Sequence, residues 1–148
     1  MTAAATDLHI CVAQDPVARA QCLALRRVVF IVEQGVSEAD ENDGLDDACL
    51  HILASLDGRP VGTARVLPMQ TIAKIQRVCI LKAMRGTGAG ARLMTFALDL
   101  IRRDGRFEIA RLGSQTYALD FYRKLGFRDY GAEYLDAGIP HRDMELAL

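Results

Sequence analysis

The feature that most restricts the fold of this chain is a glycine-rich segment, MRGTGAGARL, at residues 84–93. It stands between a β-rich run and a helical pattern of apolar residues. The first turn of a helix leaves backbone N–H groups without partners, and the helix dipole adds partial positive charge there. Glycines let the backbone approach a bulky anion, because no Cβ stands in the way. The order strand, glycine loop, helix therefore predicts a binding site for a pyrophosphate group.

Two familiar phosphate-binding patterns fit this segment poorly. The Walker pattern requires Gly-Lys-Ser/Thr, which is absent from this segment. The dinucleotide pattern is matched only in its looser form, by Gly86, Gly88 and Ala91. Asp104 or Glu108 would then be the acidic residue that such a fold requires further along the chain. That pattern belongs to a parallel nucleotide fold, whereas the chain before the loop has the pattern of a hairpin meander.

Hydrophobic periodicity and turn residues predict one α+β domain over residues 1–148, with a mixed, mostly antiparallel sheet of six to seven strands flanked by helices. Asp57-Gly58 is a strong hairpin signal, Asp15-Pro16 marks a helix start, and Gly126 marks a helix end. The predicted strands cover residues 7–13, 49–56, 60–67, 72–81, 107–112, 127–130 and 143–146. The predicted helices cover residues 17–32, 89–104 and 116–125.

Composition excludes several classes of protein. The formal net charge is −1 and no basic stripe is visible, so we expect no nucleic acid partner. The apolar runs are too short to span a membrane, and the N-terminal segment lacks the basic start and long apolar stretch of a secretory signal. Four cysteines lie far apart without a CxxC pair, at positions 11, 22, 49 and 79. We therefore expect free thiols, no metal site and a cytoplasmic protein.

The glycine segment also fits a third pattern, R-x-x-G-x-G, through Arg85, Gly88 and Gly90. The stretch RVCILKAMRGTGAGARLM, residues 77–94, resembles the cofactor motif of the GNAT superfamily of N-acetyltransferases. A second stretch, ALDFYRKLGF at residues 118–127, matches the family pattern AxxxYxxxGF at the expected distance. The resemblance is strong over residues 61–127 and implies the GNAT fold.

A narrower resemblance lies outside these two motifs. The chain is similar to the ElaA-like group of the superfamily in Leu25-Arg26, Val29-Phe30, Glu33-Gln34, Asp43-Gly-Leu-Asp46, His51 and Gly138-Ile139-Pro140-His141. Arg26, Phe30 and the acidic stretch before Asp46 also resemble the acyl-homoserine lactone synthases, which leaves a second choice of substrate. The chain is short for that group, and its opening helix lacks tryptophan.

The resemblance implies that acetyl-CoA lies in a cleft where the strand ending at Leu81 and the strand 107–112 splay apart. Backbone groups of Val78, Cys79 and Ile80 would pair with the pantetheine arm. The pyrophosphate would be held by backbone N–H groups of Arg85, Gly86, Thr87, Gly88, Ala89 and Gly90. Phe121 and Lys124 would flank the CoA, although Lys124 fits a solvated helix charge equally well. Gln115 stands where many members carry an asparagine that bonds CoA or substrate.

The implied reaction is direct transfer of an acetyl group to a primary amine. A backbone amide, that of Ile80 or a neighbour, would polarise the thioester carbonyl. Tyr122 occupies the position of the family's acid, which gives a proton to the departing thiolate. The base that takes the proton from the ammonium is left open among Glu33, His51 and His141. Each has a structural alternative: a bridge to Arg26 for Glu33, a bond to a backbone carbonyl for His51, and support of a turn for His141.

An acidic segment, residues 37–47, contains six carboxylates and no lysine or arginine. In the family this region forms the wall on the acceptor side of the cleft. The segment would attract a small cationic acceptor or a peptide amine, or it is simply a solvated loop. The spacing of a calcium-binding loop is absent, whether the count begins at Glu38 or at Asp40.

Two functions of different classes follow. The first is an acetyl-CoA-dependent N-acetyltransferase, which the intact Tyr122 favours. The second is a catalytically silent module that senses acyl-CoA, toward which the missing asparagine points. Exposed final strands in this fold often pair between subunits, so the resemblance leaves a homodimer open beside a monomer.

Overall fold

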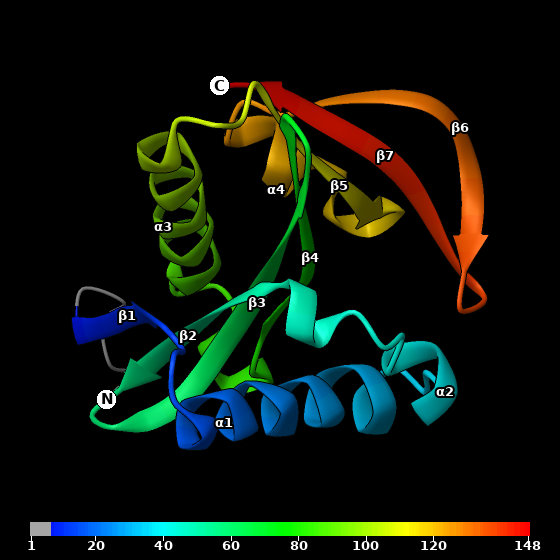
Figure 1. Cartoon of the computed structure of the whole chain (residues 1–148). Helices are drawn as coiled ribbons and strands as arrows, with labels where there is room; N and C mark the ends of the chain where they lie inside the picture. The colour runs from blue at the N-terminus through cyan, green and yellow to red at the C-terminus, as the bar shows by residue number, and fades with distance from the viewer. Residues whose placement is uncertain (1–6) are drawn as a thin grey trace.

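The computed structural model describes residues 7–148, and its centre is a sheet with the strand order β1-β2-β3-β4-β5-β7-β6 (Figure 1). Its strands are β1 (Leu8–Val12), β2 (Leu50–Leu56), β3 (Arg59–Met69), β4 (Ile72–Ile80), β5 (Ile109–Gln115), β6 (Arg128–Asp136) and β7 (Ile139–Ala147). Neighbouring strands are antiparallel except for β4 and β5, which run parallel. This confirms the predicted α+β class and the mostly antiparallel sheet.

Helices cover both faces of the sheet (Figure 1). They are α1 (Pro16–Arg26), which continues as a π-helix over Arg27–Glu33, then α2 (Glu38–Glu41), α3 (Ala89–Asp104) and α4 (Leu119–Lys124). Side chains of a strand alternate between faces, and β2 shows the division. Ile52 and Ala54 pack in the core with α3 and α4, whereas Leu53 packs with Cys22 and Leu25 of α1.

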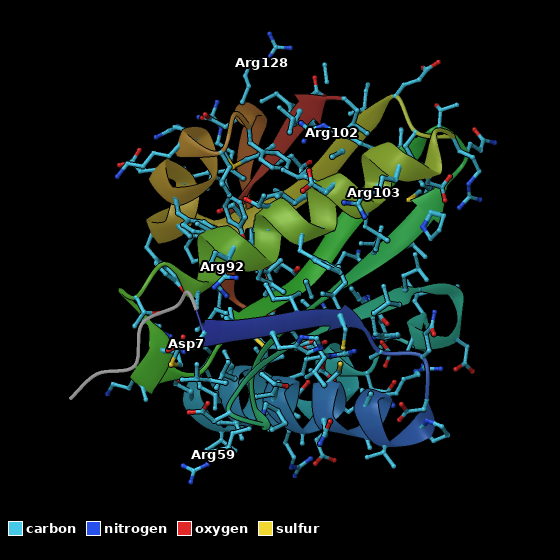
Figure 2. All side chains as sticks on the ribbon, turned by 90° about the vertical axis from the view of Figure 1, so that its left-hand side faces the viewer. Asp7, Arg59, Arg92, Arg102, Arg103 and Arg128 are labelled. Atoms are coloured by element: carbon cyan, nitrogen blue, oxygen red, sulfur yellow. The ribbon has the colours of Figure 1, made fainter. Side chains whose placement is uncertain are left out.

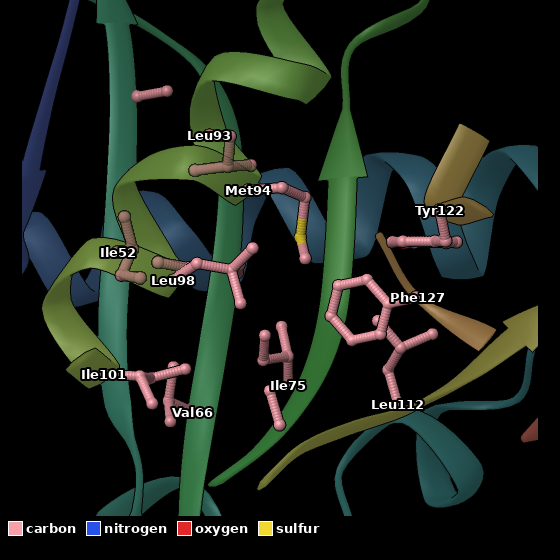
Figure 3. Packing of buried hydrophobic residues seen from close by; sticks show 14 of the residues in the cluster. Ile52, Val66, Ile75, Leu93, Met94, Leu98, Ile101, Leu112, Tyr122 and Phe127 are labelled. Atoms are coloured by element: carbon pink, nitrogen blue, oxygen red, sulfur yellow. The ribbon is translucent and has the colours of Figure 1, made fainter. Parts of the chain in front are cut away.

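The helix α3 follows the amphipathic pattern of its sequence. Figure 2 shows Arg92, Arg102 and Arg103 on its outer side. Arg102 and Arg103 lie in the last turn, where positive charge is favourable to the helix dipole. Its opposite side is buried against the sheet, and Figure 3 shows Leu93, Met94, Leu98 and Ile101 against strand residues that include Ile52, Val66 and Ile75. This packing fixes the start of α3, and therefore the glycine loop, relative to β4.

The first helix begins as predicted, because the Asp15 side chain accepts a hydrogen bond from the backbone N–H of Ala18 at 2.8 Å. Its end differs from the prediction. Residues 27–33 form a π-helix, in which the N–H of Gln34 donates to the carbonyl of Val29, five residues back, at 3.1 Å. The apolar spacing of the sequence does not distinguish this wider turn from an α-helix.

The C-terminal strands are longer than predicted. The sequence indicated strands over 127–130 and 143–146, whereas β6 and β7 form one long hairpin with its turn at Ala137-Gly138. The side chains of β6 are mostly exposed, so the strand has no apolar alternation to reveal it. The strand β5 also extends further than predicted, to Gln115, and α4 begins only after a 3₁₀ turn at Thr116–Ala118.

The two parallel strands separate along their length. Register pairs join β4 to β5 only from Ile72–Ile109 to Lys74–Arg111. Beyond Lys74 the β5-facing edge of β4 has no strand partner in the described part of the chain. The predicted splay between these strands is confirmed.

A bulge in β4 accompanies the separation. The pairing of β3 with β4 passes from Thr63–Cys79 to Arg65–Gln76, which leaves one extra residue in β4. Arg77, in this bulge, has a φ of 54°. Bulges bend the strand that carries them, which here directs the end of β4 away from β5.

No helix within residues 7–148 is both long and apolar enough to span a membrane. The prediction that the N-terminal segment is not a secretory signal rests partly on residues 1–6, which lie outside the described residues.

Candidate active site

A cavity of about 190 Å³ lies where β4 and β5 separate. Its walls come from these two strands, the start of α4, the end of the π-helix and β7. Four predicted site residues line it together: Val78, Gln115, Tyr122 and His141. Phe30 and Gln34 line it too. In the sequence, these two residues were identified only by family resemblance and not as candidate site residues.

Tyr122 is fixed in the wall of this cavity by aromatic packing. Its ring meets Phe121 and Phe127 edge to face, with centroids 4.9 Å and 6.0 Å away. Burial raises the pKa of the Tyr122 phenol well above its ordinary value. The phenol is therefore protonated at neutral pH and able to donate.

The tautomer of the neutral His141 ring is set by a backbone carbonyl. Its Nδ1 lies 2.7 Å from the carbonyl oxygen of Ile139. A carbonyl only accepts hydrogen bonds, so Nδ1 carries the proton of the neutral ring and Nε2 keeps its lone pair. The ring stacks on Tyr134 at a centroid distance of 5.9 Å, and the Tyr134 hydroxyl donates to Asp143 at 2.7 Å. His141 is thus held in the cavity wall as a potential proton acceptor.

Glu33 is placed differently from the prediction. Its carboxylate accepts two hydrogen bonds from the Arg85 guanidinium, at 2.6 Å and 2.9 Å, instead of bridging to Arg26. These bonds lower the pKa of Glu33. Glu33 does not line the cavity, so this geometry disfavours it as the base.

His51 is also outside the cavity. It is 3% exposed, and its Nε2 lies 2.8 Å from the carbonyl oxygen of Asp46. Burial lowers the pKa of His51 below its ordinary value. The structural alternative, a bond to a backbone carbonyl, therefore describes this residue. Of the three candidate bases, His141 is the one that lines the cavity.

The glycine loop has the conformation that an anion site needs. Gly86 and Gly88 have φ values of 79° and 88°, a left-handed conformation that favours glycine. Gly88 is the N-cap of α3 and makes no side-chain cap bond. Thr87 donates its hydroxyl to the Met84 carbonyl at 2.6 Å and accepts from the N–H of Ala89 at 3.4 Å. The other backbone N–H groups at the start of α3 are thus positioned to bind a pyrophosphate.

Gly90 is required by a close contact. A Cβ at this position would lie 3.3 Å from the ring of Phe121 and 3.8 Å from Ile80. Phe121 therefore packs directly on the first turn of α3, beside the glycine loop. The family resemblance implied that Phe121 flanks the CoA near this loop. Lys124 lies at the exposed end of α4 and does not line the cavity, which agrees with its reading as a solvated charge.

The end of β4 offers backbone groups to a ligand. Val78 lines the cavity, and Ile80 pairs with Gly62 of β3 on its other edge. The carbonyl of Ile80 also accepts a hydrogen bond from Nε of Arg85 at 3.1 Å. The Cys79 side chain points into the core under α1, where burial raises its pKa to about 12. Cys79 thus contributes backbone, and its thiol is inert.

The acidic segment is largely neutralised by arginines. Arg26 and Arg65 are 1% and 0% exposed, and both bond Asp46, at 2.7 Å and 2.9 Å. Arg26 also bonds Glu41, and Arg65 bonds Asp43. The segment is therefore more than a solvated loop, and most of its charge is already paired. The arginines of this network lie on α1, β3 and β4, and no local sequence pattern links them to the acidic segment.

Of the six carboxylates, one has no cationic partner within residues 7–148. Glu38 and Asp47 pair with Arg27 and Arg19, at 2.7 Å and 3.3 Å. Asp40 has none, and it lines a second cavity of about 60 Å³. The two cavities adjoin and share Phe30, Gln34, Arg77, Gln115, Asp136 and His141.

Comparison with known proteins assigns the family. The model of the acetyltransferase (GNAT) domain matches residues 25–148. The chain belongs to the GNAT family. It is 38% identical to the Bacillus subtilis protein YjcF, an uncharacterised N-acetyltransferase, over 81% of this chain and 86% of YjcF.

The ElaA-like resemblance within the GNAT family is confirmed. Escherichia coli ElaA is 32% identical over 82% of each chain. The ElaA crystal structure aligns with a TM-score of 0.81, covering 94% of this chain and 97% of ElaA at 28% identity. An acyl-CoA N-acyltransferase from Pseudomonas aeruginosa aligns with a TM-score of 0.83, covering 95% and 99% of the two chains at 30% identity.

Proposed function

We propose that this GNAT protein is an acetyl-CoA-dependent N-acetyltransferase that moves an acetyl group directly to a primary amine. The observation that carries the proposal is the shared cavity, in which Tyr122 and His141 line one space where β4 and β5 separate. A Bacillus subtilis acetyltransferase crystallised in complex with CoA has this fold, with a TM-score of 0.72 at 16% identity.

The residues present fit the cofactor. The glycine N-cap of α3 and the left-handed glycines suit a pyrophosphate, and the unpaired edge of β4 suits an extended pantetheine arm. In this proposal, backbone N–H groups from Arg85 to Gly90 hold the phosphates, and backbone groups from Val78 to Ile80 hold the arm. When bound, acetyl-CoA supplies the acetyl group as a thioester.

The chain's own residues would move two protons. His141 takes one proton from the acceptor ammonium at Nε2, which frees the nitrogen lone pair to attack the thioester carbon. The backbone amide of Ile80 or its neighbour polarises the carbonyl. As the C–S bond breaks, Tyr122 donates its proton to the sulfur. The proton lost by the new amide nitrogen restores Tyr122, and His141 releases its proton to solvent, so the products are an N-acetylated amine, CoA and one proton.

The acceptor proposed here is small and carries a second positive charge, with a peptide lysine as the alternative. Asp40 and Asp136 line the second cavity from the acidic segment and from the β6–β7 turn. Neither forms an ion pair within residues 7–148, whereas Arg77 in the same wall is bonded to the carbonyl of Glu41 and lies 3.5 Å from Asp43. Two uncompensated carboxylates beside aliphatic walls favour a diamine over a monoamine.

The test of this function is release of CoA from acetyl-CoA in the presence of 1,4-diaminobutane or n-butylamine. We expect turnover with both amines and a lower KM for the diamine. Asp40→Asn and Asp136→Asn should raise the KM for the diamine and change that for n-butylamine little. The control is Asp57→Asn, in the distant β2–β3 turn. Absence of turnover with every amine would contradict the proposed function.

A further inference from the structure

We propose that Gln34 is a positioning residue that orients Gln115 as a second hydrogen-bond acceptor for the attacking amine, beside His141. The inference rests on the proposed function and adds what selects an amine that carries at least two N–H groups. It involves one residue, Gln34, that no phosphate or acid–base pattern in the sequence identifies.

Gln34 and Gln115 form a hydrogen bond across the cavity. Nε2 of Gln115 donates to Oε1 of Gln34 at 2.9 Å, which joins the end of the π-helix to the end of β5. Both residues line both cavities. Because Nε2 of Gln115 is engaged, its Oε1 is the atom of that amide left to accept a hydrogen bond.

The strand register places this oxygen close to the proposed base. Gln115 and His141 are direct partners in the antiparallel pairing of β5 with β7. Directly opposite side chains share a face of the sheet, with Cβ atoms about 5 Å apart. Nε2 of His141 is an acceptor because Nδ1 is bound to the Ile139 carbonyl. Two hydrogen-bond acceptors, Oε1 of Gln115 and Nε2 of His141, therefore come from paired residues of one cavity wall.

The backbone at Gln34 is held by hydrogen bonds of Gln34 itself and of the preceding residue. Its backbone N–H is bound to the Val29 carbonyl in the widened helical turn. The preceding residue, Glu33, is tied by two hydrogen bonds to Arg85 of the glycine loop. Glu33 thus contacts the glycine loop, and the next residue, Gln34, contacts the strand that carries Gln115. The backbone from which the Gln34 side chain extends is therefore held in place.

Two adjacent acceptors match the hydrogens of a primary amine. An ammonium group R-NH3⁺ can give one proton to His141 and donate another N–H to Gln115, which leaves the lone pair created by deprotonation free for the attack. An N-methylated amine still has the two N–H groups that these acceptors need, whereas an N,N-dimethylated amine has the same charge and only one. The arrangement therefore selects amines with at least two N–H groups by hydrogen bonding, independently of charge.

The experiment measures binding, so that it does not depend on turnover. Protein saturated with CoA is titrated with n-butylamine and with N,N-dimethylbutylamine, and NMR signals of the glutamine side-chain amides and of His141 report the affinity. The readout is the ratio of the two affinities, because both probes carry the same charge. We expect the wild type to prefer n-butylamine, and Gln34→Ala to reduce that preference about tenfold.

Two further variants separate orientation from bulk. Gln34→Glu should restore the preference, because a carboxylate also accepts from Nε2 of Gln115. The double variant Gln34→Glu/Gln115→Glu has two acceptors face to face and no donor, and it should lose the preference again. Gln14→Ala, an exposed glutamine before α1, is the matched control. CoA affinity by calorimetry shows that each variant is folded.

The inference is overturned if Gln34→Ala keeps the preference, if Gln34→Glu fails to restore it, or if n-butylamine does not bind the wild-type complex. A wild type that binds n-butylamine with this preference yet transfers no acetyl group would contradict the proposed function and support the inference. The two failures are therefore distinguishable.

Discussion

Tyr122 and His141 are prepared for opposite proton transfers by their surroundings. Burial against Phe121 and Phe127 keeps the phenol of Tyr122 protonated. The Ile139 carbonyl fixes the proton of His141 on Nδ1 and leaves Nε2 without one. An acid and a base in one cavity are what acetyl transfer to an ammonium requires.

Replacing Tyr122 with phenylalanine tests the acid. We expect kcat to fall about a hundredfold or more, because the thiolate would depart without a proton. The affinity for acetyl-CoA should stay close to that of the wild type, since the ring packing is retained. Steady-state kinetics and calorimetry measure the two quantities. Unchanged turnover would show that Tyr122 is not the acid, and a wild type that binds acetyl-CoA without turnover would favour the sensing module.

Replacing His141 with glutamine tests the base. We expect a large loss of kcat/KM at neutral pH and recovery toward pH 10, where a free alkylamine begins to lose its proton unaided. A pH–rate profile of the variant beside the wild type makes the measurement. His9→Gln, at an exposed position of β1, is the matched control. A rate deficit that is equal at all pH values would point to a structural role for His141.

At the scale of elements, the acidic segment is a structural clamp as much as a wall. Arg26 and Arg65 donate hydrogen bonds to its carboxylates. Arg77 donates to its backbone carbonyls at Asp40 and Glu41, at 3.2 Å and 3.0 Å. The bulged position of Arg77 in β4 is thus bound to the loop that lines the second cavity. Movement of this loop would disturb the walls of both cavities.

The clamp makes stability depend on acid. Hydrogen bonds from Arg65 hold the pKa of Asp43 well below its usual range. Although burial opposes it, hydrogen bonds from Arg26 and Arg65 also lower the pKa of Asp46. A lowered folded-state pKa stabilises the protein above the unfolded value of about 3.9, and this contribution is lost as pH falls through the folded value. We expect the urea-unfolding free energy to decline below about pH 4, and less steeply in Asp43→Asn. A parallel decline in both proteins would contradict this.

The contact at Gly90 gives a prediction for the cofactor loop. Gly90→Ala places a methyl group 3.3 Å from the Phe121 ring, so the ring must shift by a few tenths of an ångström. We expect CoA binding by calorimetry to weaken several-fold, by about 1 kcal/mol, while far-UV circular dichroism stays unchanged. Unaltered affinity would show that Phe121 does not touch the cofactor.

The sequence predicted the elements whose signals are local. The Asp57-Gly58 hairpin, the glycine loop and the helix that follows it lie where expected. The π-helix was missed because its apolar spacing equals that of an α-helix, and β6 because its exposed side chains carry no alternation. Arg65 was missed because its partner Asp43 is 22 residues away and only the folded sheet brings them together. Among the bases, residue type alone could not separate His141 from His51.

At the scale of the whole molecule, the candidate site depends on segments from nearly the full length of the chain. The cavity uses the end of the first helical region, the two separated strands, α4 and the last hairpin. Ligand binding should therefore stabilise the entire fold and not one segment of it.

Thermal unfolding with and without acetyl-CoA tests this coupling. At a ligand concentration of one hundred times Kd, we expect the unfolding free energy to rise by about 2.7 kcal/mol. The double variant Arg85→Ala/Gly88→Val should lose the effect, because valine is strained at a φ of 88° and the Glu33–Arg85 pair is removed. Stabilisation of the variant equal to that of the wild type would place the cofactor elsewhere.

The pairing of Gln115 with His141 also makes the length of the last hairpin informative. Successive residues of a strand face opposite sides, so one residue added to β7 between its turn at Ala137-Gly138 and His141 would turn the imidazole out of the cavity. Two added residues would return it to the same face, but one pair further along β5. The number of residues between turn and histidine can thus sort related sequences, before any of their structures is known, into those that keep this base and those that must use another.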